Sequence, residues 1–291
     1  MKVIFLFVLF IPLFLYAQKP LKKAGLQMMI QPKVSLESGH ISNANVSGYK
    51  GSVGVTKTRL SINNKIAGIS YTSWAFDWKN VAKLPFGDGV HSPITQMHSM
   101  RAHVNVPYFF SDKIFIITSL SFKSTFEKET DGSYGGGFFS FASYKLNENH
   151  AIQFGAFVNY HPVSTLAMPV ISYSYRARQS DGFKFILGYP RTYVGYHLNE
   201  PALLRLGVIF SQSVIRLSND SVVEKSGFIE AEDYMSNIGF SYELNKNFTF
   251  ESDLLYSIKR NFTIYSKKGD KLSTHSIEPS FGMNFKVRYI F

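Results

Sequence analysis

The segment Gly39-His40-Ile41-Ser42-Asn43-Ala44 combines residue types and a spacing that suit nucleophilic catalysis. Successive side chains of a β-strand point to opposite faces, so His40 and Ser42 would share a face. The imidazole of His40 could then act as a general base toward the hydroxyl of Ser42, which would be the nucleophile. Asn43 could donate a hydrogen bond to the resulting oxyanion. The segment therefore suggests acyl transfer, if the elements around it can position these groups.

Other kinds of chemistry find little support in the composition. The chain has 291 residues and no cysteine, which excludes thiolate zinc sites, thiol redox centres and disulfide-stapled domains. Its eight histidines are scattered, without the HExxH pattern of zinc proteases or an acidic calcium loop. We therefore expect no metal ion and no cofactor.

The N-terminus predicts export. Lys2 provides a positive charge, residues 3–16 form an unbroken apolar run, and the small residue Ala17 precedes Gln18. This run is too short to span a bilayer as a mature helix and ends as a secretory signal does, which makes an N-terminal membrane anchor the weaker alternative. The sequence thus predicts a cleaved signal peptide over residues 1–17 and a single domain over residues 18–291.

Apolar residues of the mature chain recur at every second position, which indicates β-strands. Several of these runs reach about nine residues, the length that a tilted strand needs to cross a bilayer, whereas ordinary strands average five or six. The 27 Phe and 17 Tyr gather near the run ends, as in the aromatic girdles of membrane barrels. A soluble β-sandwich also alternates, but strand length and girdles favour a transmembrane antiparallel β-barrel. Clear examples are 100–108, 114–122, 204–210, 238–244 and 248–256.

The last eleven residues alternate completely and end on an aromatic side chain. One face carries Phe281, Met283, Phe285, Val287, Tyr289 and Phe291. This pattern resembles the C-terminal signature of Gram-negative outer-membrane β-barrels. The resemblance implies an outer-membrane location, recognition of the last strand by the barrel-assembly machinery, help from periplasmic chaperones, and pairing of the last strand with the first. Such pairing removes the exposed edges of the sheet.

Connection lengths predict twelve to fourteen strands. With a first strand over residues 26–36, short periplasmic turns and long outer segments alternate as in membrane barrels. A hairpin at Tyr189-Pro190-Arg191 gives fourteen, because proline donates no ladder hydrogen bond and suits a turn; without that hairpin, twelve strands stay open. The expected long outer segments are 38–50, 80–95, 127–136, 217–233 and 260–276.

The polar face of the strands would line the barrel lumen, and its charge is mainly basic. The net charge of +11 makes an anion-preferring, passive, porin-like channel the leading prediction. Charges that merely pair with one another inside the barrel are the alternative. We expect outer-membrane lipids and lipopolysaccharide as surroundings, and no nucleic acid. The predicted lumen-lining residues are Arg101, Arg176, Lys184, Arg205, Glu243, Glu251, Asp253, Lys286 and Arg288.

Two other functions remain as alternatives to the channel. The His40–Asn43 segment is similar to the His-x-Ser-Asn stretch of outer-membrane lipid A deacylases, which implies a lipid-modifying hydrolase with His40 as base, Ser42 as nucleophile and Asn43 as oxyanion donor. That family has a smaller barrel and carries the motif near its C-terminus, followed by an acidic partner, whereas here Glu37 precedes it. The leading prediction is that the protein is not an enzyme. The third possibility is a non-conducting scaffold or adhesin barrel.

Overall fold

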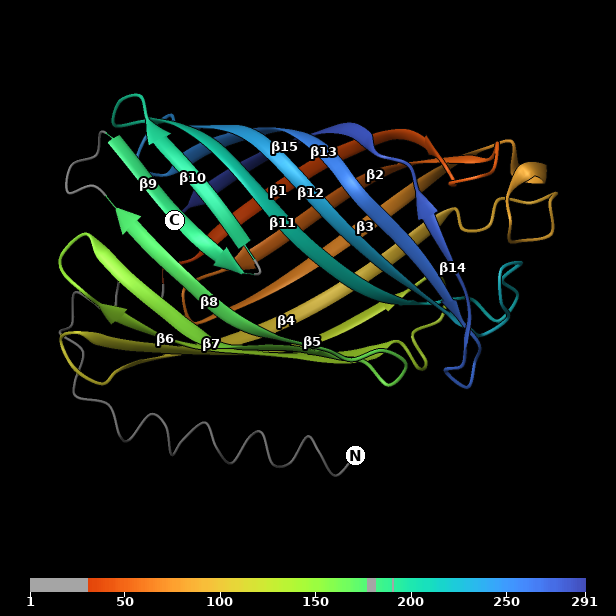
Figure 1. The fold of residues 1–291 in the computed structure, drawn as a ribbon, viewed down its shortest axis with the longest axis horizontal. Helices are drawn as coiled ribbons and strands as arrows, with labels where there is room; N and C mark the ends of the chain where they lie inside the picture. The colour runs from red at the N-terminus through yellow and green to blue at the C-terminus, as the bar shows by residue number, and fades with distance from the viewer. Residues whose placement is uncertain (1–30, 177–181, 190) are drawn as a thin grey trace.

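The described residues form one antiparallel sheet that closes into a barrel (Figure 1). The computed structural model describes residues 31–176, 182–189 and 191–291, so the predicted signal peptide lies outside them. Fifteen strand segments are present there, and β14 and β15 lie end to end beside β13. The wall therefore has fourteen strand positions, as the hairpin at Tyr189–Arg191 predicted, and twelve is excluded.

The strands differ in length. The long ones, β12 and β13, have 16 and 18 residues, whereas β9 and β10 have eight and seven. Within the described part of the chain, no helix is long and apolar enough to span a membrane. The elements are β1 (Lys33–Asn45), β2 (Ser52–Asn63), β3 (Ala67–Lys79), the 3₁₀ turn η1 (Val81–Lys83), β4 (Gln96–Phe109), β5 (Ile114–Phe126), β6 (Tyr134–Lys145), β7 (His150–Tyr160), β8 (Leu166–Arg176), β9 (Gly182–Tyr189), β10 (Arg191–His197), β11 (Ala202–Arg216), β12 (Phe228–Glu243), β13 (Phe248–Tyr265), β14 (Lys271–Ile277) and β15 (Ser280–Ile290).

The first and last strands close the barrel. β1 pairs with β15 in an antiparallel ladder from Lys33 opposite Ile290 to Ile41 opposite Gly282. The backbone N–H of Phe291 donates to the carbonyl of Pro32 at 3.1 Å, which ties down the chain end. The predicted pairing of the C-terminal segment with the first strand is confirmed.

The β9–β10 hairpin is too short to fill the wall. β9 pairs with β8 only from Ile171 to Arg176, and β10 pairs with β11 only as far as Ile209. Beyond the end of the hairpin, residues 166–170 of β8 and 210–215 of β11 form no backbone hydrogen-bond ladder with each other. β11 instead crosses toward β5, where Arg216 pairs with Phe126 in parallel. We call this interruption of the ladder the β8–β11 break.

The polarity of the two faces reverses along the strands, as β3 shows. In the first half of β3 the outward residue Ile69 is 60% exposed, and the inward residues are small and polar. Farther along, outward Ala75 and Asp77 are exposed while inward Trp78 is buried. An apolar outside suits lipid and a polar outside suits water, so the strands continue beyond the membrane. We call the part beyond the reversal the outer extension (residues 41–57, 74–97, 215–231 and 260–277) and the rest of the strands the membrane zone.

Apolar side chains fill the interior of the outer extension. The Trp78 ring lies 6.5 Å from that of Phe262 on β13 and 5.7 Å from that of Phe86, and its Nε1 donates to the Ile94 carbonyl at 2.6 Å. Dispersion contacts and burial of this cluster close the outer end of the barrel. The other buried members are Ala44, Val46, Val53, Ile94, Met97, Ile215, Leu217, Ile229, Ile264 and Ile277.

This extension corrects three expectations. The first described strand runs to Asn45, so most of 38–50 is strand and not an outer loop, and most of 260–276 is strand as well. Of 217–233, only 228–233 is strand, and the rest is a connection as expected. The part of the expected first strand before residue 31 lies outside the described residues. The interior is also not polar throughout. Polar residues on the water-facing outside of these strands gave the segments a loop-like composition, although their backbone remains paired.

Candidate functional site

All nine predicted lumen residues lie on the inner face of the barrel. Residues directly opposite one another in an antiparallel pair share a face. Arg176 stands opposite Lys184, which connects through Gly195 to Arg205. The remaining six join the same face through the pairs Arg205–Gly239, Gly239–Asp253, Glu243–Thr249, Thr249–Arg288 and Glu251–Lys286, and through the series Arg288–Ser35–Ser61–Ser70–Arg101.

One side of the lumen is a network of paired charges. Arg205 donates from Nη1 to Glu251 Oε2 at 2.9 Å and from Nη2 to Asp253 Oδ1 at 3.0 Å. Arg288 also bonds to Glu251, and Lys286 Nζ lies 4.0 Å from it. On this side, formed by β11, β13 and β15, the carboxylates are satisfied by basic partners, as charges in a partly buried interior require.

Gly239 permits this network. It lies on β12 between Arg205 and Asp253, and a Cβ there would come within 2.0 Å of Asp253 Oδ1 and 3.1 Å of the Arg205 guanidinium. Only glycine lets the two charged groups meet across the intervening strand. The network thus depends on a residue that carries no functional group.

The adjoining wall, from β2 to β5, carries cations that form no salt bridge with a described carboxylate. Arg101 and Lys123 stand directly opposite each other on β4 and β5, and Arg59 on β2 donates to Ser70 Oγ at 3.3 Å. Among the described residues, none of these three cations forms a salt bridge. Arg101 is exposed although it points inward, which shows that this part of the interior is accessible to water. The wall therefore presents uncompensated positive charge to the lumen.

Sequence reasoning missed Arg59 and Lys123. The signal was present in β2, where Lys57, Arg59 and Ser61 alternate with the outward apolar residues Leu60 and Ile62. Lys123 is the one charged residue of β5, whose other residues are apolar or carry hydroxyl groups, so no row of charges indicated its lumen-facing position. Glu37, which reaches Lys57 Nζ at 2.9 Å, also belongs to the inner face.

A polar network holds the β8–β11 break together. Asn159 of β7 donates to Gln212 of β11 at 2.9 Å, and Gln212 in turn bonds to Glu230 of β12. Glu230 also accepts from Ser164 Oγ at 2.7 Å and from Tyr265 OH at 2.7 Å. The inner face of β7 and the β7–β8 connection thus lie against the outward face of β11 and β12. Side-chain bonds replace the missing backbone ladder here.

His161 in the β7–β8 connection is buried beside this network. Its ring lies 5.3 Å from that of Phe228, edge to face. Burial, and then the positive charge of Lys123, lower the pKa of His161 to about 4, although Glu230 opposes this effect. The imidazole is therefore neutral at physiological pH, and its proton uptake would disturb the packing of the break.

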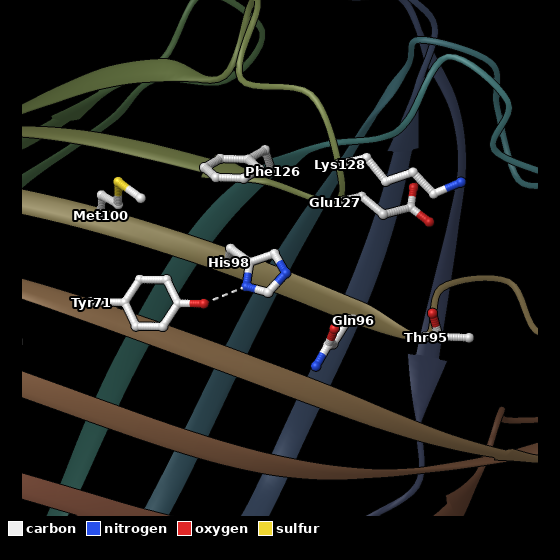
Figure 2. A pocket seen from close by; sticks show the side chains of 8 residues that line it. All are labelled: Tyr71, Thr95, Gln96, His98, Met100, Phe126, Glu127 and Lys128. Carbon is white, nitrogen blue, oxygen red and sulfur yellow. Dashed lines mark hydrogen bonds between the residues drawn. The ribbon is translucent and has the colours of Figure 1, made fainter.

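A concavity lies on the outside of the barrel (Figure 2). Its volume is about 530 Å³, and it occupies the level at which the outward face changes from apolar to polar. Outward Tyr71 and Met100 line its apolar part, whereas Gln96 and Lys128 line its polar part. Tyr71 OH and His98 Nδ1 are hydrogen-bonded at 2.7 Å, as Figure 2 shows. Because it faces away from the lumen, this concavity is no part of a pore.

The predicted catalytic segment lies in β1, on the outside of the barrel. His40 and Ser42 are both exposed, and His40 Nδ1 is hydrogen-bonded to Thr56 Oγ1 at 3.0 Å. A bulge between Ile41 and Ala44 interrupts the regular register, and Asn43 donates to Asp77 at 3.4 Å. The described residues contain no group of three His, Asp or Glu side chains placed to hold a metal ion.

Solved structures of outer-membrane channels resemble most of the chain at low similarity. The NanC porin matches with a TM-score of 0.41 and 9% identity, covering 88% of this chain and 98% of its own. An outer membrane channel from Pseudomonas putida F1 matches with a TM-score of 0.43 and 8% identity, over 90% and 96%. The Ralstonia pickettii toluene transporter TbuX matches with a TM-score of 0.41 and 9% identity, over 91% and 90%. No protein-family model and no curated protein matches the sequence.

Proposed function

We propose that the protein is a passive, porin-like channel of the outer membrane for small anionic solutes. The carrying observation is a closed barrel whose inner face in the membrane zone is polar, accessible to water and basic on one side, where Arg59, Arg101 and Lys123 form no salt bridge with any described carboxylate. A water-filled passage lined with one sign of charge concentrates ions of the opposite sign. The apolar outward belt supports a location in a membrane.

The outer opening of this channel is proposed to lie in the side of the barrel. Apolar packing in the outer extension blocks the barrel axis. The β8–β11 break lacks a backbone ladder, so its opening would rupture a few side-chain hydrogen bonds, whereas opening the wall elsewhere would rupture a row of backbone bonds. The break is therefore the part of the wall that separates at the lowest free-energy cost.

Planar-bilayer recording tests the proposed function. In a salt gradient, the purified barrel should show channels whose reversal potential indicates anion preference. The double variant Arg101→Gln/Lys123→Gln should reduce that preference, because two uncompensated charges leave the lumen. The matched control is Lys79→Gln, an exposed residue of the outer extension paired with Asp77. Cation preference in the unmodified protein would refute the proposed selectivity.

Cross-linking the break tests the lateral opening. The chain contains no cysteine, so Asn159→Cys and Gln212→Cys introduce a single reactive pair, which a short bis-methanethiosulfonate cross-linker can join through reducible disulfide bonds. Conductance should fall when the link forms and return on its reduction. The control pair, Val208→Cys and Ser236→Cys, joins strands that already form a ladder and should leave conductance unchanged. Persistent conductance across a completed link at the break would exclude this route.

A non-conducting scaffold is the second candidate, because the packed outer extension closes the barrel axis. A barrel that stays silent in bilayers under voltage and across pH, while folded, would favour this function. The exposed position of Ser42 gives no comparable support to a hydrolase.

Export and assembly complete the proposal. The signal peptide should be removed after Ala17, so N-terminal sequencing of the mature protein should begin at Gln18. The outward row that ends at Phe291, which is 62% exposed, would be presented to the barrel-assembly machinery after delivery by periplasmic chaperones. The outward apolar belt would contact lipids, with lipopolysaccharide in the outer leaflet.

A further inference from the structure

The inner wall contains a cavity where β15, β1 and β2 meet. Its volume is about 270 Å³, and its lining is predominantly polar. Four basic side chains border it: Lys33, Arg59, Lys286 and Arg288. All four lie on the inner face, at the junction that closes the barrel. The cavity is therefore open to solutes in the lumen and shielded from lipid.

Positive charge at this cavity exceeds the negative charge. The carboxylate in its lining, Glu37, is held by Lys57 at 2.9 Å, and Lys286 and Arg288 share Glu251 with Arg205. Lys33 and Arg59 form no salt bridge within the described chain, and Arg59 Nε is buried without a hydrogen-bond partner. A guanidinium with an unsatisfied buried donor favours an acceptor that is not provided by the protein.

Hydroxyl groups complete the lining. Ser35 Oγ and Ser61 Oγ are hydrogen-bonded to each other at 2.7 Å and are both buried. One hydroxyl donates to the other, so the acceptor of this pair keeps its own hydrogen for a further bond. The cavity thus combines a planar guanidinium, an ammonium group and a hydroxyl donor, a set that matches the several acceptor oxygens of a compact oxyanion.

We propose that this cavity is a binding site for a compact, doubly charged oxyanion, either phosphate or a small dicarboxylate. Arg59 and Lys33 supply the charge that the protein leaves uncompensated, and Ser35 or Ser61 supplies a neutral donor. The proposal rests on the proposed function and deepens it, because it gives the channel an anion-binding site in the periplasmic half of the lumen. Binding itself requires access to the lumen and not conduction.

Calorimetric titration of the detergent-solubilised full barrel with inorganic phosphate, and separately with succinate, tests the site. At least one anion should bind saturably, and the preferred one identifies the class. Arg59→Gln should weaken binding about tenfold, since a charge-assisted hydrogen bond is lost, and Arg59→Lys should restore part of the affinity. Lys33→Gln should weaken it in the same direction. The control Lys79→Gln lies outside the lumen and should bind as the unmodified protein does.

The outcomes separate the site from the channel. Absence of saturable binding for both anions, or equal weakening by Lys79→Gln, overturns the site even if the barrel conducts anions. Saturable binding that depends on Arg59 in a barrel without conductance supports the site and refutes the channel. If Arg59→Gln does not fold, the measurement with Arg59→Lys and Lys33→Gln decides, because both retain the size and polarity of the lining.

Discussion

The membrane zone and the outer extension use the same strands with opposite polarity. In the membrane zone, large apolar residues such as Ile69 and Leu254 point outward and are 60% and 64% exposed, while the inner face holds charges and hydroxyls. In the outer extension, Trp78, Phe262 and Ile264 point inward and are buried. The solvent outside sets the difference: lipid selects apolar side chains, and water selects polar ones.

The difference has a consequence for stability. The outer extension is built as a soluble β-structure is, with a hydrophobic core, and burial drives its packing. The membrane zone gains little from such burial and depends on its backbone ladder and on interior polar contacts such as those around Glu251. Loss of an inward side chain should therefore cost more stability in the outer extension, whereas a charge on the outward face should cost more in the membrane zone.

Removal of the central aromatic residue of the outer extension should have the largest effect. Trp78→Ala should destabilise it by about 3–5 kcal/mol, the usual cost of a cavity left by a buried tryptophan. The chain has two tryptophans, Trp74 and Trp78, both on the inward face of β3, so Trp74 fluorescence in the variant still reports on this region during urea unfolding. Thr72→Ala, on the same face in the membrane zone, is the control and should cost much less.

A charge on the lipid-facing surface should have the next largest effect. Ile69→Lys should destabilise the barrel by about 1–3 kcal/mol, because a lysine on the lipid-facing surface is costly and the cost is lower away from the bilayer midplane. Ala75→Lys places the same charge on the same face of β3, but in the outer extension, where the side chain is exposed to water. It should change the free energy of unfolding by less than about 0.5 kcal/mol. Folding equilibria in lipid vesicles give both values, and equal costs would remove the distinction between the two regions.

Acid should weaken the β8–β11 break. The pKa of His161 is about 4 in the folded protein, and the pKa of an imidazole in an unfolded chain is about 6.5. The folded state therefore resists protonation, so this contribution to stability is complete above about pH 6.5 and falls as the pH is lowered toward 4. His161→Gln cannot titrate, so its melting temperature should depend less on pH than that of the unmodified protein. Identical pH profiles would contradict the assigned role of His161.

The smallest effect is expected at the segment that first suggested chemistry. Ser42→Ala should leave the acylation of lipid A unchanged when the protein is expressed in a Gram-negative host. His40 is hydrogen-bonded to Thr56, and His40 and Ser42 are both exposed on β1. Mass spectrometry of extracted lipid A measures this. An acylation change that depends on Ser42 would revive the hydrolase alternative.

Much of the barrel could be predicted because its signals are local. The two-residue period of β4, β5, β11, β12, β13 and β15 identifies strands, and the row ending at Phe291 identifies the closing strand. The nine lumen residues could be assigned to one face by parity alone. The pairing partner of Arg205 could not be assigned, because it depends on Gly239 and on strand neighbours that are far apart in the chain.

The outer extension shows where the sequence was informative and where it was not. On β3, apolar residues shift from odd positions, Ile69 and Tyr71, to even positions, Trp74 and Trp78, so the reversal of faces is written in the sequence. On β13, Leu254 and Phe262 have the same parity but point to opposite sides. A bulge at Ile258 changes the phase of the strand between them, and this bulge is visible only in the pairing with β12.

The sequence by itself determined that the chain forms long alternating strands, ends with an aromatic closing strand and carries a basic polar face, because these depend on side-chain order along the backbone. The tertiary structure decided that the outer end is packed, that the wall is interrupted between β8 and β11, and that Arg59 and Lys33 border one cavity without a salt bridge to any described residue. These features depend on register, shear and strand length, through which residues distant in the chain become neighbours.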